Sequence, residues 1–184
     1  MIHLPTRIDL IKMMPAGSIG AEIGTWRGYF SSDILNQTKV GKLYCIDSWR
    51  GQTGIYTPEP KTDEQHEADM FEAFWHVRGH NGRVEIIRAS SKAAATNLRH
   101  LPALDWAYVD ADHSYEGCLE DLYLWSKHLK AGGYLMGHDL TDNEQAKKLG
   151  FGVIKAVADF CKDDGWIMTH VTDEEFASFA LQKK

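Results

Sequence analysis

A carboxylate and an imidazole stand three residues apart in the stretch YVDADHSYEG, residues 108–117, directly after an apolar run. They are Asp110 and His113, and a second pair, His138 and Asp139, follows the apolar run YLMG. Two carboxylates and an imidazole can hold a divalent cation, whose charge would lower the pKa of a bound hydroxyl. An imidazole, with an ordinary pKa of about 6.5, could accept the hydroxyl's proton. The pattern predicts a metal site at Asp110, His138 and Asp139, with His113 as the base and Asp110 beside it in the catalytic group.

The identity of the cation and the ligand set stay open at the level of sequence. Mg or Mn is expected, although an imidazole ligand suits Mn, Fe, Ni or Zn better than Mg. Asp139 could bind the cation alone, with His138 behind it as a hydrogen-bonding partner. Asp112 fits neither role and is expected to cap the helix that begins at Ser114. A plainer interpretation is that all these charges are solvated loop residues.

The segments that must position these side chains alternate between extended and helical patterns. Apolar runs predict strands at 18–24, 42–48, 83–89, 104–111 and 132–139, and a closing hairpin of strands at 166–171 and 176–182. Helical patterns cover 28–38, 64–79, 90–100, the segment from Ser114 onward and 153–165. The order predicts an α/β fold, a doubly wound Rossmann-like seven-stranded sheet. Its strands would be parallel except in the C-terminal antiparallel hairpin, with helices on both faces. Residues 1–184 are expected to form a single domain.

The composition and net charge of the chain indicate which classes of binding partner to expect. The chain has 184 residues, of which 43% are hydrophobic, and a formal net charge of −6. Such a chain has no basic field to attract nucleic acid or an anionic membrane, so neither is expected as a partner. Cys45, Cys118 and Cys161 are widely spaced, which indicates reduced thiols. No signal peptide and no apolar run of about 20 residues is present, so a cytoplasmic protein is expected.

Ligands of a doubly wound sheet bind beyond the carboxyl ends of its strands. After the first strand, EIGTWRGYFSS places Gly24 and Gly28 in a tight turn that opens a helix, where backbone N–H groups can meet a ligand. The dinucleotide fingerprint G-x-G-x-x-G is absent, and Glu22 suits an ammonium group better than a pyrophosphate. Asp47 ends the second strand, where an acid can accept both ribose hydroxyls of a nucleoside. Taken singly, each residue is equally well explained as a turn or cap residue.

The combination resembles the class I S-adenosylmethionine-dependent methyltransferases from about residue 15 to residue 184. It consists of Glu-x-Gly-x-x-x-Gly after the first strand, an acid after the second, a polar end to the third and the closing hairpin. The resemblance implies that Gly24 lies by the methionine portion of the cofactor, Asp47 by the ribose and Ser90 by the adenine. The full cofactor-binding set that it implies is Glu22, Gly24, Trp26, Gly28, Asp47, Ser48, Trp49, Ser90 and Asp110.

A narrower resemblance rests on VDADHSYEG followed by LKAGGYLMGHD, which look like the small-molecule and sugar O-methyltransferases, a branch similar to methyltransferase family 24. That branch carries an acidic metal ligand after strand four, a base three residues on and two ligands after strand five. Here these are Asp110, His113 and the pair His138 and Asp139; the imidazole at 138 departs from the usual carboxylate or amide. The implied function is divalent-metal-assisted O-methylation of a small hydroxylated molecule, such as a sugar, a phenol or a natural product.

Two other functions remain open at the level of sequence. One is a metal-dependent hydroxylase or hydrolase with a site of two histidines and one carboxylate; the other is a non-catalytic cofactor-binding protein. Substrate contacts are expected from the loops at 49–61, with Trp49, Arg50 and Tyr56, and at 140–152. His76 and His80 are interpreted as surface residues. An open pocket would fit a homodimer.

Overall fold

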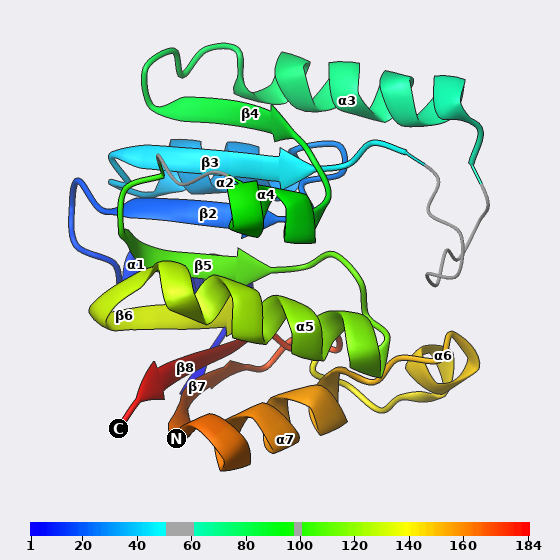
Figure 1. Ribbon diagram of the computed structural model, residues 1–184. Helices are drawn as coiled ribbons and strands as arrows, with labels where there is room; N and C mark the ends of the chain where they lie inside the picture. The colour runs from blue at the N-terminus through cyan, green and yellow to red at the C-terminus, as the bar shows by residue number, and fades with distance from the viewer. Residues whose placement is uncertain (51–60, 98–100) are drawn as a thin grey trace.

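The computed structural model describes residues 1–50, 61–97 and 101–184, which form one mixed sheet with helices on both faces (Figure 1). The strands are β1 (Ile2–Leu4), β2 (Ile19–Ile23), β3 (Lys42–Asp47), β4 (Val84–Arg88), β5 (Leu104–Val109), β6 (Leu129–Gly137), β7 (Trp166–Thr172) and β8 (Phe179–Lys183). The helices are α1 (Arg7–Lys12), α2 (Tyr29–Gln37), α3 (Asp63–Val77), α4 (Ser91–Asn97), α5 (Tyr115–Trp125), α6 (Glu144–Lys148) and α7 (Val153–Asp164), with a 3-10 turn η1 (Ser126–His128).

The strand order is β1-β7-β8-β6-β5-β2-β3-β4. Strands β2 to β6 are mutually parallel, β8 pairs antiparallel with both β6 and β7, and β1 pairs parallel with β7. Since β2 lies between β3 and β5, the chain winds first to one side of β2 and then to the other. This reversal is the switch point at which doubly wound sheets bind ligands.

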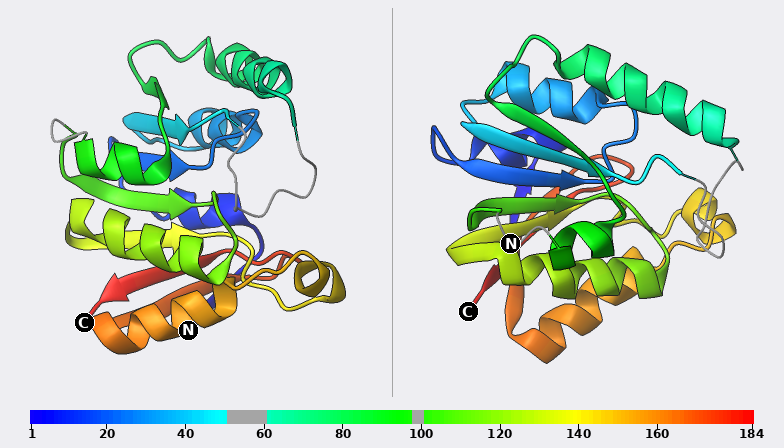
Figure 2. Two further views of the ribbon diagram at one scale, coloured as in Figure 1. Left: turned by 45° about the vertical axis from the view of Figure 1, so that its right-hand side comes forward. Right: turned by 45° about the horizontal axis from the view of Figure 1, so that its top comes forward.

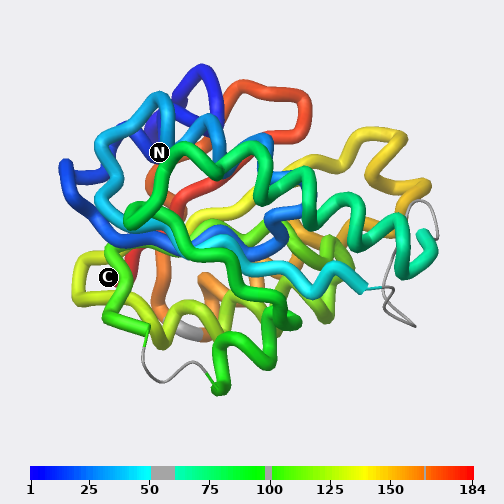
Figure 3. The backbone as a smooth tube through the Cα atoms, turned by 90° about the horizontal axis from the view of Figure 1, so that it is seen from above, coloured from blue at the N-terminus to red at the C-terminus, as the bar shows by residue number. Residues whose placement is uncertain are grey.

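An apolar layer holds the helices on each face of the sheet. On one face α1, α2 and α3 pack through side chains that include Leu10, Ile34 and Val77. On the other face α4, α5 and α7 pack through side chains that include Leu122 and Phe160. Figure 3 shows α2 and α3 on one side of the strands and α4 and α5 on the other. The doubly wound α/β prediction is therefore confirmed.

The sheet has eight strands among the described residues, so the predicted count of seven was wrong. The additional strand, β1, pairs over three residues, Ile2 to Leu4, with His170 to Thr172 of β7. A three-residue strand is too short to show a periodic pattern. The last strand begins at Phe179, three residues later than predicted, because the connection covers residues 173–178 instead of residues 172–175. The predicted 140–152 loop contains the short helix α6, which projects beyond the strand ends (Figure 2).

Helix α3 leaves two of its large aromatic side chains in solvent. Phe71 and Phe74 are 66% and 47% exposed, whereas Asp69, Ala73 and Val77 are buried. Ion pairs explain the orientation, because the carboxylate of Asp69 accepts hydrogen bonds from Arg27 and Lys61. Ala73 lies against the start of α2, which brings the backbones of the two helices close together.

The three cysteines are free, as predicted, with Cys45 and Cys118 buried. Across the described ranges, the structure contains no helix with the length and apolar character needed to span a membrane.

Candidate active site

The parallel register brings four strand ends to one level. Ile23 of β2 pairs with Ile46 of β3 and with Val109 of β5, and Val109 pairs with Gly137 of β6. The residues that follow these positions are the predicted Gly24, Asp47, Asp110 and His138. Residues as far apart in the chain as Gly24 and His138 thus meet because the strands end together.

A cavity of about 760 Å³ lies beyond these strand ends. Of the predicted site residues, ten line it: Glu22, Gly24, Trp26, Asp47, Ser48, Ser90, Asp110, His113, His138 and Asp139. Gly28 and Trp49 lie outside its lining. A Cβ at Gly28 would lie 2.9 Å from the Cα of Ala73, so this glycine permits the close packing of α2 on α3. Trp49 is 1% exposed and is part of the core beneath the loop.

The turn after β2 needs a glycine at position 24. Its φ of +95° is strained for other residues, and a Cβ there would lie 2.0 Å from the carbonyl oxygen of Asp110. The amide of Gly24 donates to the carbonyl of Ile46 at 2.8 Å. Gly24 therefore lets the ends of β2, β3 and β5 approach each other closely around the cavity.

Glu22 is a buried carboxyl group in the cavity wall. It is 1% exposed and accepts a hydrogen bond from the hydroxyl of Ser31. Burial raises the pKa of Glu22 to about 8, because removal from water disfavours the charged form. This group is therefore largely protonated at neutral pH in the absence of a cationic ligand.

Asp47 organises the loop on which it lies. Its two carboxylate oxygens accept from the backbone amides of Trp26 and Trp49, each at 2.8 Å. Both tryptophans have left-handed backbones, with φ of 48° and 43°, and the indole of Trp49 donates to the carbonyl of Trp26 at 2.7 Å. Burial raises the pKa of Asp47, although the two amides oppose the change. Each oxygen keeps a further lone pair, so the carboxylate can still accept a ligand's hydroxyl groups.

The indole of Trp26 forms part of the rim of the cavity and is 52% exposed. Its Nε1 donates to Asp69 at 3.1 Å, and the cations of Arg27 and Lys61 lie 4.8 and 5.0 Å from its ring centroid. These contacts fix the orientation of an aromatic wall at the mouth.

The end of the cavity near α4 and α5 contains a carboxyl group that the sequence did not reveal. Asp121 of α5 is 5% exposed, and the hydroxyl of Ser91 donates to it. Ser91 in turn accepts from the indole of Trp125 at 2.9 Å. Burial raises the pKa of Asp121 to about 7. This polar group lies at the same end as Ser90, which the resemblance assigned to adenine.

Two carboxylates and two imidazoles meet at the ends of β5 and β6. The Nε2 of His113 lies 3.3 Å from Asp110 Oδ1 and 3.1 Å from Asp139 Oδ2. The Nδ1 of His138 lies 3.7 Å from the same Asp110 oxygen and 3.3 Å from the same Asp139 oxygen. The predicted meeting of Asp110, His113, His138 and Asp139 in one pocket is thus what the structure has.

The pKa values within this cluster respond to the mixture of charges. Burial alone would lower the pKa of His113, but its hydrogen bond to Asp110 and the charges of Asp110 and Asp139 outweigh burial and raise it. The pKa of His138 is likewise raised, since Asp139 and Asp110 outweigh burial. Burial would raise the pKa of Asp139, but the two imidazoles and Arg7 lower it. Both histidines therefore hold their protons more tightly than free imidazole when no cation is bound.

Loops on both sides hold His113 in place. The cap of α5 is Ser114, whose hydroxyl accepts from the amide of Gly117, so Asp112 is not itself the capping residue that was expected; it accepts from the amide of Ser114 at 2.9 Å and so fixes the cap. Gly152 donates to the carbonyl of His113 at 2.8 Å, and the ring of Phe151 contacts the imidazole edge-on at 4.8 Å between centroids. The predicted substrate loop at 140–152 thus positions the imidazole.

The candidate metal ligands differ from the predicted set in one residue. Among the described residues, Asp110, His113 and Asp139 form the group whose ligand atoms all lie within 4.8 Å of one another. His113, predicted as the base, replaces His138 in this group. Asp139 reaches its position through a left-handed backbone, φ 58°, which no sequence pattern predicts. Two carboxylate oxygens and one imidazole nitrogen fit a first-row divalent cation.

Arg7, at the start of α1, also lines the cavity and had no role in the sequence interpretation. Of the other predicted positions, Tyr56 lies outside the described residues. Arg50 is exposed and does not line the cavity. His76, interpreted as a surface residue, is half-buried, and its Nδ1 donates to the carbonyl of Arg27 at 2.8 Å.

Comparisons with known proteins identify the family of the chain. Residues 21–140 match the family model described as a methyltransferase domain, methyltransferase family 24. The chain belongs to this methyltransferase family. The class I resemblance drawn from the strand-end residues is thereby confirmed. A curated relative, uncharacterized protein R132 of Acanthamoeba polyphaga mimivirus, is 27% identical over 141 residues. The alignment covers 75% of the methyltransferase chain and 58% of the relative, so the chain spans little more than half of that protein's length.

Solved structures share the fold of the methyltransferase at low sequence identity. An O-methyltransferase family protein from Burkholderia thailandensis has a TM-score of 0.66 at 13% identity, over 96% of this chain and 55% of that one. SMU.1697c from Streptococcus mutans, in complex with SAH (S-adenosylhomocysteine), has a TM-score of 0.66 at 13% identity, over 96% and 95%. The tRNA methyltransferase TrmK of B. subtilis has a TM-score of 0.62 at 11% identity, over 100% and 68%.

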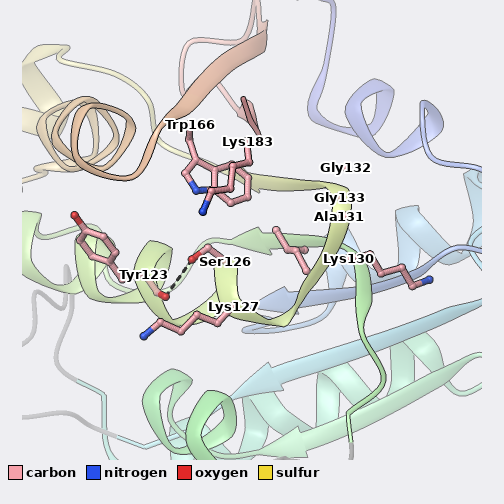
Figure 4. A pocket seen from close by; sticks show the side chains of 10 residues that line it. Tyr123, Ser126, Lys127, Lys130, Ala131, Gly132, Gly133, Trp166 and Lys183 are labelled. Carbon is pink, nitrogen blue, oxygen red and sulfur yellow. Dashed lines mark hydrogen bonds between the residues drawn. The ribbon is translucent and has the colours of Figure 1, made fainter.

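The cavity of the methyltransferase fits S-adenosylmethionine, the methyl donor of this class. Its volume lies within the range of ligand sites, roughly 300–1,000 Å³. Gly24 keeps the turn clear of side chains, Asp47 offers lone pairs to ribose hydroxyls, and Glu22 can pair with an ammonium group. Figure 4 shows a second, smaller cavity of about 390 Å³ at the start of β6, between Lys127 and Trp166. It contains none of the predicted site residues.

Proposed function

We propose that this chain transfers the methyl group of S-adenosylmethionine to a hydroxyl of a small hydroxylated molecule, with a divalent cation at Asp110, His113 and Asp139. One observation carries the proposal: the three residues whose atoms could hold a cation line the same cavity as Gly24 and Asp47. A cation held there would lower the pKa of an acceptor hydroxyl beside the cofactor's methyl group. Transfer from a sulfonium needs alignment and a deprotonated oxygen, and it needs no covalent enzyme intermediate.

The residues would divide the work between the two ends of the cavity. Asp47 and the polar groups at Ser90 and Asp121 would hold the nucleoside. Asp110 and Asp139 would supply the negative charge that a cation requires. The acceptor's proton would pass to the imidazole that is not a ligand.

The two imidazoles differ in how well they suit each task. Nε2 of His113 lies closer to both carboxylates than Nδ1 of His138, by 0.4 Å to Asp110 (3.7 − 3.3) and 0.2 Å to Asp139 (3.3 − 3.1). We take His113 as the ligand, because it belongs to the group of three residues whose ligand atoms lie within 4.8 Å of one another, and His138 as the proton acceptor. This assignment exchanges the roles that were predicted from the sequence.

A small acceptor is favoured over RNA by charge, although the structural relatives include a putative rRNA methylase from Clostridium thermocellum and the tRNA methyltransferase TrmK. The chain carries a net charge of −6, and the cations of the cavity lining are Arg7 and Lys92, one on each side of the sheet, with no cluster of Lys and Arg among the described lining residues. Nucleic-acid binding depends on neutralising phosphates with clustered Lys and Arg. An acidic chain without such a cluster at its cavity supports a small hydroxylated molecule instead.

The test is transfer of labelled methyl from S-adenosylmethionine to a panel of phenols and sugars, with Mn²⁺, with Mg²⁺ and with EDTA. We expect cation-dependent transfer that Asp139→Asn abolishes. Asp142→Asn, an exposed change three residues away, is the matched control and should keep full activity. Cofactor binding without transfer to any hydroxyl would contradict the proposal. Oxidation or hydrolysis that needs no S-adenosylmethionine would favour the hydroxylase or hydrolase interpretation.

The roles of the two histidines are distinguished by the same transfer assay together with titration of Mn²⁺. His113→Ala should weaken Mn²⁺ binding, whereas His138→Ala should leave Mn²⁺ bound and slow transfer. The reverse result would restore the assignment made from the sequence.

A further inference from the structure

We propose that Arg7 binds an anionic group of the methyl acceptor, so that the substrates of this site are hydroxylated molecules that also carry a carboxylate or a phosphate. The inference rests on the proposed function and adds the acceptor's chemical class to it.

Arg7 is fixed in place by its backbone and by its side chain. It is the first residue of α1, after the capping residue Thr6, and its amide donates to the carboxylate of Glu174 at 2.7 Å. Its guanidinium lies over the ring of Phe30, 4.2 Å from the centroid, which orients the planar group by cation–π attraction. The side chain is 30% exposed and lines the cavity. A cation is therefore held at the cavity wall.

The donors of this guanidinium are poorly used within the described part of the chain. Its single ion pair there is with Asp110, at 3.9 Å between Nη1 and Oδ2, which is beyond hydrogen-bond length. No hydrogen bond from the guanidinium to any described residue is present. A guanidinium has five N–H donors in a planar fork, which match the two oxygens of a carboxylate or phosphate. The fork can therefore bind an anion that enters the cavity.

The position of Arg7 assigns that anion to the acceptor. Ser90 and Asp121 lie at the end of the cavity near α4 and α5, on the opposite face of the sheet from α1. Arg7 lies beside Asp110, at the place where the hydroxyl would meet the cation. A group bound to Arg7 thus lies next to Asp110 and away from the nucleoside end, and with S-adenosylhomocysteine already bound, the cofactor's own carboxylate is not the anion that the experiment below measures.

Neutral acceptors would be selected against at this position. An acceptor that displaces water from Arg7 without accepting its hydrogen bonds leaves a desolvated charge without a partner. An acidic acceptor replaces the lost water with charge-assisted bonds. We expect a preference of about 10- to 100-fold for the acid over its neutral analogue, from the usual strength of hydrogen bonds to charged groups.

The experiment measures binding of matched acid and neutral probes to protein saturated with S-adenosylhomocysteine, in EDTA so that no metal can hold the acid. The pairs are protocatechuate with catechol, glucuronate with glucose, and glucose 6-phosphate with glucose. The first two acids report a carboxylate and the third a phosphate. We expect the wild type to favour at least one acid by about 10- to 100-fold.

Arg7→Met keeps an apolar stem on Phe30 and should remove this preference, while Arg7→Lys, which keeps the charge without the fork, should retain part of it. Lys12→Met removes a cation from the same helix outside the cavity and should change nothing. Equal binding of acid and neutral probes in every pair, or an acid preference that survives in Arg7→Met, would overturn the inference. S-adenosylhomocysteine affinity, measured first in each variant, reports the fold. Its absence in the wild type would count against the proposed function instead.

Discussion

Replacing Glu22 with glutamine should stabilise the protein at alkaline pH and have a much smaller effect at acid pH. The carboxyl group is 1% exposed, and burial raises its pKa from 4.5 to about 8. Between these pH values the unfolded chain has released the proton while the folded protein still holds it. The folded state then binds more protons than the unfolded state, so the free energy of unfolding falls as pH rises.

The size of the effect follows from the two pKa values. At about 1.36 kcal/mol for each pH unit between 4.5 and about 8, the wild type loses roughly 5 kcal/mol as an upper bound. This contribution is fully present below pH 4.5 and is lost once the pH has passed the folded value of about 8. Glutamine does not titrate, so the variant lacks this part of the pH dependence.

The assay is urea unfolding at intervals from pH 5 to pH 9, with stability compared at each pH. The glutamine variant should gain on the wild type as pH rises, and the difference should level off above pH 8. Any altered hydrogen bonding with Ser31 adds a pH-independent offset, so the slope is the informative quantity. Glu85→Gln, at an exposed strand position, is the control and should show no such slope. A constant difference between Glu22→Gln and wild type across the range would refute the reasoning.

Three further outcomes follow from the described contacts. Gly24→Ala should lower both stability and methyl transfer, because its Cβ would lie 2.0 Å from the carbonyl oxygen of Asp110, at the end of β5. Thermal unfolding and the transfer assay measure the two effects. Unchanged stability and activity would show that the backbone of this turn does not approach Asp110 so closely. Asp47→Ala should weaken S-adenosylhomocysteine binding at least about tenfold, from loss of hydrogen bonds to a charged group, while His113→Ala spares it. Equal losses in calorimetry would contradict this division of roles. Phe71→Ala should change the free energy of unfolding by less than about 0.5 kcal/mol, because the ring is exposed. Val77→Ala should lower it by about 1–3 kcal/mol, because Val77 is buried. Urea unfolding measures both changes, and a larger loss in Phe71→Ala than in Val77→Ala would contradict the orientation of α3.

The order of the main strands could be predicted because long apolar runs carry a strong signal. Once β2, β3, β5 and β6 are parallel, the residues that end them must meet, which is why Asp47, Asp110 and Asp139 were found together. Strand β1, which was not predicted, has no apolar run long enough to indicate a strand. Strand β1 has three residues and gains its stability by pairing with β7, far away in the sequence.

The details of the site depended on tertiary contacts that leave no mark on the sequence. Phe71 and Phe74 of α3 face solvent because Asp69 forms ion pairs with Arg27 and Lys61. The spacing of apolar residues along the helix does not reveal these ion pairs. Arg7 reaches the cavity only because α1 folds back against α2, so its position in the sequence was uninformative.

Calorimetric titration of S-adenosylhomocysteine into the metal-free protein, repeated with Mn²⁺, tests the central claim most directly. We expect cofactor binding in the micromolar range and a separate heat of Mn²⁺ binding that disappears in Asp139→Ala. Absence of cofactor binding under both conditions would contradict the account and leave the cluster of histidines and aspartates to a different chemistry.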